Sequence, residues 1–165
     1  MSGKITKTMS EVKRISWEEI KLIWETQLWP NKTGGVKPYN KWTWRYPSRY
    51  FGFEYNMEVS PVFFGIYEED ILVSVNSCYM SNDWRDSVYF RSRGLWTSPE
   101  YRKQGYASSI LLETIKYAKE NSGTWIWSVP RNSALVAYEN VGFKQWSAWM
   151  GELEYGPNCI ATKYL

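Results

Sequence analysis

The feature that most constrains this chain is a strand, a short glycine-containing loop and a helix in direct succession. Residues 88–97 have the pattern of a strand, 98–107 form the loop, and 108–121 have helical spacing. The first backbone N–H groups of a helix lack an intrahelical partner, and the helix macrodipole adds partial positive charge at the same end. Gly105 and Ala107 let an anion approach the backbone closely, while basic side chains stand at the rim of the loop. The sequence therefore predicts a phosphate or diphosphate site.

The composition is typical of a single globular domain. The chain has 165 residues and a hydrophobic share of 44%, which allows one sizeable core. No apolar run reaches the roughly 18 residues of a membrane span, and none of signal-peptide length follows the N-terminus. We therefore expect a cytoplasmic protein without membrane contact, in which Cys78 and Cys159 are free thiols. The net charge of +3 permits an anionic ligand.

The absence of histidine limits the possible chemistry. It excludes a Ser-His-Asp triad, a Cys-His dyad and a histidine metal site. Two distant cysteines cannot by themselves form a structural zinc site, so no metal is expected. Any reaction must use tyrosine, carboxylates, lysine, serine, cysteine, backbone groups or water. Neither cysteine has a visible activating base, which argues against a covalent thiol mechanism.

The first 30 residues contain a predicted strand and helix. The strand lies within 5–15 and is followed by a capping box, with Ser16 as the N-cap and Glu19 as the third helical residue. Helical spacing of apolar residues continues to about Trp29, and Pro30 ends the helix.

Residues 31–60 form an insertion in which aromatic and basic side chains are interleaved. Aromatic residues make up 18% of the chain, so some rings must stay partly exposed. One interpretation is that the rings of this insertion cover a face of the core. The other is that they form an acceptor-binding surface, because basic and aromatic residues together suit phosphate contacts and base stacking.

Residues 61–67 and 71–80 are predicted to form an antiparallel hairpin, with positions 71, 73 and 75 on one face. A polar loop is expected at 81–87. The next strand contains Gly94, and a glycine inside a strand often marks a β-bulge.

The second half is predicted to contain a right-handed crossover. The helix after the loop leads to an apolar strand at 124–129, which is expected to lie parallel to 88–97. A short helix follows over 132–140, and 143–149 pairs with 159–165 to close the sheet.

Three motifs, taken in order, resemble those of the GNAT superfamily of acyl-CoA N-acyltransferases. The first, Arg102-x-x-Gly105-x-Ala107, is similar to the phosphate loop of the family. The second is the amphipathic helix and strand that follow it. The third is similar to the signature A-x-x-x-Y-x-x-x-G-F and consists of Ala134, Tyr138, Gly142 and Phe143. The resemblance covers 61–145 well, and the first 60 residues agree only in the order of elements.

The resemblance implies an α/β (α+β) fold. The sheet would be mixed and mostly antiparallel, with a splayed parallel strand pair and helices on both faces. Residues 1–165 would form one acetyltransferase domain with the insertion at about 31–60. The pantetheine arm of coenzyme A would enter the splay, which a bulge at Gly94 would help to open.

The resemblance also implies which residues bind acetyl-CoA as a cosubstrate. Backbone groups of three strand residues would pair with the acyl carbonyl and the pantetheine, and the loop would hold the diphosphate. Tyr138 would be the catalytic residue, as the general acid for the departing thiolate. The cofactor-binding residues expected in this way are Leu95, Trp96, Thr97, Arg102, Lys103, Gln104, Gly105, Tyr106, Ala107, Asn132 and Tyr138.

Two positions depart from the family pattern. The family commonly has an asparagine seven residues before the tyrosine, but this position is Arg131 here, and Asn132 follows it. Either the loop is shifted by one residue, or Arg131 has another role, such as a contact with a CoA phosphate. The strand 88–97 also lacks the glutamate base of some members. The carboxylates that could replace it through a water are Asp83, Asp86, Glu54 and Glu58.

The predicted function is transfer of an acetyl group from acetyl-CoA to an amine by direct attack in a ternary complex. The alternative is a non-catalytic domain that binds CoA or nucleic acid, which the missing base and the displaced asparagine would favour. The sequence does not identify the acceptor, the acyl chain length or the oligomeric state, which is a monomer or a homodimer. Four arginines would suit an anionic acceptor such as a nucleotide, or are ordinary surface charges: Arg45, Arg49, Arg91 and Arg93.

Overall fold

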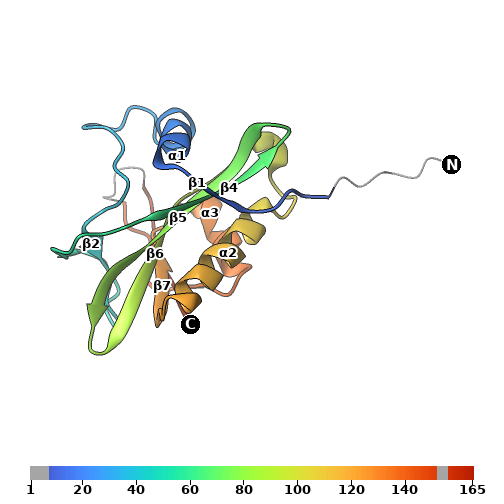
Figure 1. Cartoon of the computed structure of the whole chain (residues 1–165). Helices are drawn as coiled ribbons and strands as arrows, with labels where there is room; N and C mark the ends of the chain where they lie inside the picture. The colour runs from blue at the N-terminus through green and yellow to red at the C-terminus, as the bar shows by residue number, and fades with distance from the viewer. Residues whose placement is uncertain (1–7, 152–155) are drawn as a thin grey trace.

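The computed structural model describes residues 8–151 and 156–165, so the start of the predicted N-terminal strand lies outside the described part. Seven strands form one sheet in the order β1-β4-β5-β6-β7-β9-β8 (Figure 1). Neighbouring strands are antiparallel except for β6 and β7, which are parallel. The strands are β1 (Lys13–Ile15), β4 (Val62–Glu68), β5 (Ile71–Trp84), β6 (Ser87–Thr97), β7 (Trp125–Ser128), β8 (Lys144–Gln145) and β9 (Ala161–Tyr164).

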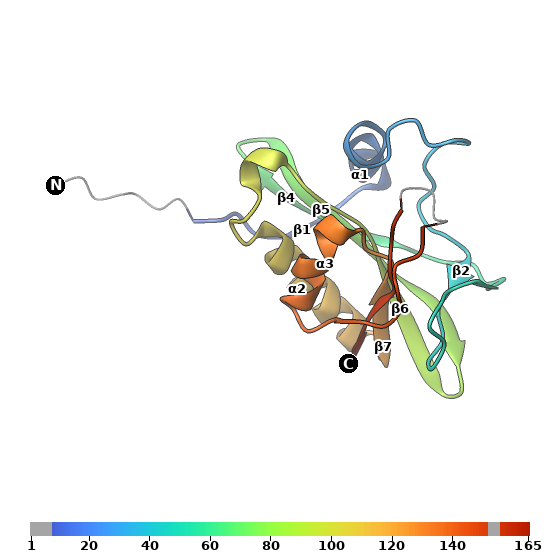
Figure 2. The ribbon, with the colours of Figure 1, turned by 180° about the vertical axis from the view of Figure 1, so that it is seen from behind.

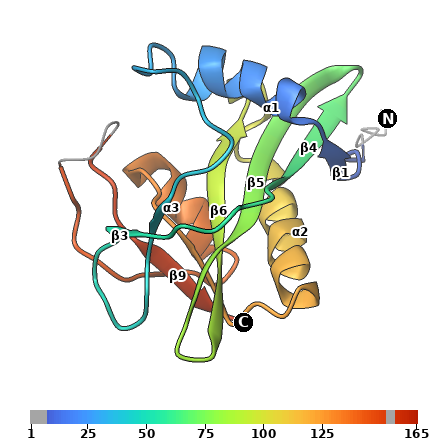
Figure 3. The ribbon, with the colours of Figure 1, turned by 60° about the vertical axis from the view of Figure 1, so that its left-hand side comes forward.

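Helices cover both faces of this sheet, which confirms the predicted fold class. The helix α1 (Trp17–Ile23) continues directly into the π-helical turn η1 (Trp24–Leu28) on one face. The helices α2 (Tyr106–Glu120) and α3 (Asn132–Glu139) lie over the other face (Figure 2, Figure 3). A 3-10 turn, η2 (Pro99–Tyr101), precedes α2. In the described ranges, none of the helices combines the length and apolarity needed to cross a membrane.

The predicted capping box at the start of α1 is confirmed. Ser16 Oγ accepts from the Glu19 backbone N–H at 3.1 Å, and the Ser16 N–H donates to Glu19 Oε1 at 2.9 Å. The helical region then ends at Leu28, close to the predicted stop. This local signal was readable because its partners lie only three residues apart.

The long β5–β6 hairpin shows that the polar loop predicted at 81–87 is wrong. Both strands run through most of this segment, and only Arg85 and Asp86 form the turn. Their φ angles are 50° and 65°, as a two-residue turn with left-handed residues requires. The polar residues of the segment have distant partners: the Trp127 indole N–H, for example, donates to the buried Ser81 Oγ at 3.0 Å.

A bulge in β5 overturns the prediction that positions 71, 73 and 75 share one face. The pairing of β4 with β5 omits Val73, so this residue is the extra one of the bulge. Val73 packs in the core beneath α2, whereas Val75 packs with Trp24 on the opposite face. Ile71 is exposed.

Some rings of the aromatic insertion cover the core, and others stay exposed. Trp44 is fully buried and packs edge-on against Tyr89 at 5.6 Å between ring centroids. Trp42 and Tyr50 remain 47% and 61% exposed. Two short strands within the insertion, β2 (Trp42–Thr43) and β3 (Phe53–Glu54), pair with each other outside the main sheet.

Glu19 links α1 to the sheet, and its ionisation should make stability depend on pH. The Tyr67 hydroxyl of β4 donates to Glu19 Oε2. The pKa of Glu19 lies below its ordinary value of 4.5, mainly because of this bond and then because of the Ser16 N–H. The lowered pKa stabilises the fold above that ordinary value, and the stabilisation is lost as the pH falls below it.

We predict that Glu19→Gln lowers the free energy of unfolding by about 1–2 kcal/mol at neutral pH. Both carboxylate oxygens of Glu19 accept a hydrogen bond, whereas the side chain of glutamine has only one accepting oxygen. The difference from the wild type should shrink between about pH 5 and pH 3. Urea unfolding across this range measures both effects. Glu18→Gln, in the same turn, is the matched control and should change stability by less than about 0.5 kcal/mol. A deficit that stays constant with pH would contradict the prediction.

Candidate active site

The parallel strands β6 and β7 separate in the middle of the molecule. They pair at only three positions, the last of which joins Arg91 to Trp127. Beyond this point β6 continues to Thr97, whereas β7 ends at Ser128. Pro130 follows shortly after and cannot donate a backbone hydrogen bond to a continuing ladder. The edge of β6 is therefore unpaired on this side over its last residues.

The predicted bulge at Gly94 is confirmed and lies in this unpaired part of β6. The pairing steps from Ser77–Arg93 to Val75–Trp96, which leaves one extra residue on β6. Gly94 has a φ of +81°, in the left-handed region that favours glycine. The Trp24 indole N–H donates to Gly94 O at 2.9 Å, so η1 is joined directly to the bulge.

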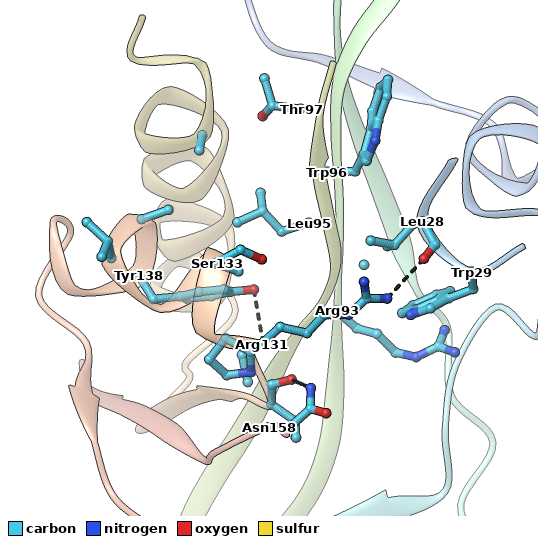
Figure 4. Close-up of a pocket in the computed structure, with 18 of the residues that line it drawn as sticks. Leu28, Trp29, Arg93, Leu95, Trp96, Thr97, Arg131, Ser133, Tyr138 and Asn158 are labelled. Carbon is cyan, nitrogen blue, oxygen red and sulfur yellow. Dashed lines mark hydrogen bonds between the residues drawn. The ribbon is translucent and has the colours of Figure 1, made fainter. Parts of the chain in front are cut away.

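A cavity of about 1360 Å³ spans the opening between β6, α2, α3 and η1 (Figure 4). In the close-up, Tyr138 and Leu95 lie on one side of it and Arg93 and Trp29 on the other. The predicted site residues that line this cavity are Leu95, Trp96, Thr97, Arg102, Lys103, Gly105, Tyr106, Ala107 and Tyr138.

Two predicted binding residues do not line the cavity. Gln104 Nε2 instead donates to Glu100 O at 2.9 Å within the loop. Asn132 is exposed at the first position of α3, and its neighbours Arg131 and Ser133 line the cavity instead. Contact of Gln104 or Asn132 with a ligand stays a prediction.

The N-terminus of α2 has the geometry of an anion site. Gly105 is the N-cap, with a φ of +90°, and the helical ladder begins with Ser109 N donating to Gly105 O at 3.0 Å. The N–H groups of Ala107 and Ser108 therefore precede the first helical bond and point out of the helix end. Arg102 Nε donates to Thr97 O at 3.0 Å, which ties the loop to the end of β6.

Tyr138 is held at the other end of the cavity by two serines. Its hydroxyl oxygen lies 2.8 Å from Ser92 Oγ and 3.0 Å from Ser128 Oγ. Ser128 Oγ also donates to the Ser92 carbonyl oxygen at 2.7 Å. Ser128 Oγ is the donor toward both the Tyr138 hydroxyl oxygen and Ser92 O, and its one hydroxyl hydrogen is shared between these two acceptors. The phenol oxygen is thus part of a buried hydrogen-bond network that holds the side chain in place.

Burial keeps this phenol neutral. Tyr138 is only 2% exposed, and desolvation raises its pKa above the ordinary value of 10.0. The bonds to Ser128 and Ser92 and the charge of Arg91 oppose this rise in pKa. The side chain can therefore act as a proton donor near neutral pH. The sequence did not suggest the two serines as partners, because they lie on different strands and carry no recognisable spacing.

The arginines that suggested an anionic acceptor are separated by the fold. Arg91 and Arg93 line the cavity. Arg45 and Arg49 do not; they stack over Trp84 at 4.2 Å and over Trp146 at 5.2 Å, respectively.

Arg131, the residue in place of the family's asparagine, crosses the cavity. Its Nη2 donates to Leu28 O at 2.9 Å, so it joins the start of α3 to the end of η1 (Figure 4). Leu28 and Trp29 also line the cavity, and nothing in their sequence pattern separated them from an ordinary helix end.

Carboxylates are absent from the described lining of the cavity. The four that were considered as indirect bases lie elsewhere, and one of them, Asp83, accepts from the Tyr55 hydroxyl at 2.6 Å. Across residues 8–151 and 156–165, no three acidic or cysteine side chains gather into a metal-binding group.

Both cysteines are free and buried. Burial raises the pKa of the Cys78 thiol far above its ordinary value and that of Cys159 to about 11. Neither residue lines the cavity. These features are those of structural rather than nucleophilic thiols.

Residues 60–145 match the family described as the acetyltransferase (GNAT) domain. This span contains β6, the loop before α2, α2 itself and Tyr138. No curated protein matches the sequence at a significant level.

Solved structures share the fold at low sequence identity. A Lactobacillus plantarum protein assigned as an N-acetyltransferase superposes with a TM-score of 0.60 and 14% identity, over 94% of this chain and 99% of that chain. The NatC complex bound to Gag peptide and CoA superposes with a TM-score of 0.54 and 17% identity, over 64% and 70% of the two chains. Ribosomal-protein-alanine N-acetyltransferase from Brucella melitensis gives 0.50 and 16%, over 64% and 69%.

The contact between Gly94 and Trp24 should be sensitive to a single methyl group. A Cβ at Gly94 would lie 2.2 Å from the Trp24 ring, whereas a Cβ at Gly34, where φ is a similar +78°, would have no atom within 4 Å apart from those of the adjacent residues. We predict that Gly94→Ala lowers the free energy of unfolding by at least about 3 kcal/mol, through both backbone strain and overpacking. Gly34→Ala should cost only about 1 kcal/mol, through backbone strain alone. Urea unfolding of both variants separates the two effects, and equal losses would mean that Trp24 moves aside freely.

Proposed function

This chain belongs to the GNAT acetyltransferase family, and from that premise we propose that it transfers an acetyl group from acetyl-CoA to an amine. Acyl transfer in general follows from the family. The transfer of an acetyl group to an amine is proposed on one observation. A single cavity connects the anion-binding end of α2, the unpaired edge of β6 and the hydroxyl of Tyr138. We also propose that residues 1–165 act as one domain, with 31–60 as an insertion.

The donor half of the proposal rests on the fit of CoA to two features of the chain. The outward-facing N–H groups at the start of α2, with Arg102 and Lys103 beside them, suit the diphosphate. The unpaired edge of β6 from Leu95 to Thr97 suits the amide groups of pantetheine, which can pair with it as an added strand does. A structural neighbour, the NatC complex, also has CoA bound.

The reaction proposed is direct attack within a ternary complex. The amine nitrogen forms a bond to the thioester carbonyl carbon, the carbon–sulfur bond breaks, and the sulfur takes a proton. Backbone N–H groups along the β6 edge would stabilise the developing oxyanion. Holding both reactants in one cavity accounts for much of the expected acceleration, because it removes the entropic cost of their encounter.

Tyr138 is the proposed source of the proton for the sulfur. Its hydroxyl is neutral and oriented by Ser92 and Ser128. The amine proton would leave through water, since no carboxylate is found in the described lining of the cavity. This proposal needs an amine that is already neutral when it attacks.

The acetyl transfer is tested by measuring thiol release from acetyl-CoA with a panel of amines.

The donor site is tested by the substitution Ala107→Glu. Ala107 lies in the first turn of α2 on the cavity wall. A carboxylate there is compatible with the helix macrodipole but repels the diphosphate, so CoA affinity measured by calorimetry should fall at least about tenfold. Turnover should fall with it.

Leu112→Glu is the matched control, because it adds the same charge to the same helix at a residue that is 57% exposed. Its CoA affinity should stay within about twofold of the wild type. Unchanged affinity in Ala107→Glu would contradict the donor site. CoA binding without thiol release from any amine would instead favour a non-catalytic CoA-binding domain.

Tyr138→Phe should lower kcat by about 100-fold or more and change CoA affinity little, because the variant removes only the proton donor. Steady-state kinetics and calorimetry measure the two effects separately. Tyr117→Phe, which removes a hydroxyl from α2 outside the cavity lining, is the control for a general effect of losing a phenol. A kcat within about twofold of the wild type would rule out Tyr138 as the acid.

A further inference from the structure

Two arginines are buried in the wall of the cavity, on one face of β6. Arg91 and Arg93 are only 8% and 4% exposed. They are two residues apart in a regularly paired part of the strand, so their side chains leave it on the same face. Burying two like charges this close is unfavourable unless an anion lies near them.

Arg91 has contacts but no charge partner among the residues that the structure describes. Its guanidinium lies 4.8 Å from the Trp127 ring, and its Nη1 donates to the Tyr79 hydroxyl at a long 3.5 Å. Its Nε is buried and has no hydrogen-bond partner. Arginines this deeply buried are normally paired with carboxylates, because an unpaired buried charge is costly.

The position of Arg91 in the cavity indicates the source of an anion that would pair with it. The residue is part of the last β6–β7 pair before the splay, and its charge acts on Tyr138. Arg91 thus lines the cavity where the splay begins, which is where the thioester would lie in the proposed function. The phosphates of CoA would lie at the start of α2, and the acyl end of acetyl-CoA is uncharged. Among the residues that the structure describes there is no carboxylate partner, so we assign an anion beside Arg91 to the second substrate.

We propose that the acceptor is a small amine that also carries a carboxylate or a phosphate group, and that Arg91 binds this anion. This inference rests on the acetyl transfer proposed above. A guanidinium presents a planar fork of donors that matches either group with two hydrogen bonds. Arg93 Nη1 donates to Lys37 O at 2.8 Å, which holds its positive charge beside the same site.

Matched pairs of amines test the proposal. α-Amino acids are compared with their decarboxylated amines, and O-phosphoethanolamine is compared with ethanolamine, so the two arms separate carboxylate from phosphate. Acetylation is followed by thiol release, and binding to the CoA complex is followed by calorimetry. In at least one arm the acid-bearing member should have a kcat/KM and an affinity at least about tenfold above those of its neutral partner.

Arg91→Met should abolish this preference, lowering kcat/KM for the acid-bearing amine at least about tenfold and leaving the neutral amine within about threefold. Arg45→Met is the matched control, because Arg45 also stacks on a tryptophan but does not line the cavity. It should keep the preference for the acid.

The outcomes separate this inference from the proposed function. Preferential binding of the acid that depends on Arg91, without acetylation of any amine, would contradict the acetyl transfer and support the anion site. Acetylation of neutral and acid-bearing amines alike, or no binding of any acid-bearing amine, would overturn the anion site. An equal loss on both members of a pair in Arg91→Met would also overturn it, because Arg91 would then act on the thioester.

Discussion

The separation of β6 from β7 is the constraint on which the rest of the site depends. The two strands pair only as far as Arg91 and Trp127, and the extra residue at Gly94 turns the end of β6 away from a flat sheet. Trp24 bonds to the carbonyl of that bulge and fills the space a side chain would need. The opening is therefore built into the core packing and does not depend on a mobile loop.

Everything proposed for function lies along this one opening. Its outer end is the start of α2, where backbone N–H groups and two cations suit phosphates. Its lining at the β6–β7 splay includes a neutral phenol and a buried guanidinium that lacks a charge partner among the described residues. Such a charge weakens the folded state, so its position in the lining of the cavity favours a role in binding over a role in stability.

The sequence predicted those elements whose partners are close along the chain. The capping box of α1, the glycine bulge and the parallel crossover from β6 to β7 were readable because each depends on a few neighbouring residues and on short connections. The prediction failed at 81–87, where serine and asparagine resemble a loop but are satisfied by partners far away in the sequence. The prediction also failed at Val73, because the extra residue of a bulge changes which face of the sheet the neighbouring side chains occupy.

By itself, the sequence determined the family and the fold class, and it predicted the loop for a diphosphate. The glycine, the small residue and the helix pattern that encode them are local and independent of what packs around them. Only the tertiary structure decided which residues face the reaction space: it brought Ser92 and Ser128 to Tyr138, and it separated Arg91 and Arg93 from Arg45 and Arg49. The reason is that the register of the strands and the separation of β6 from β7 set which side chains meet across the sheet. Neither of these leaves a periodic pattern in the amino-acid sequence.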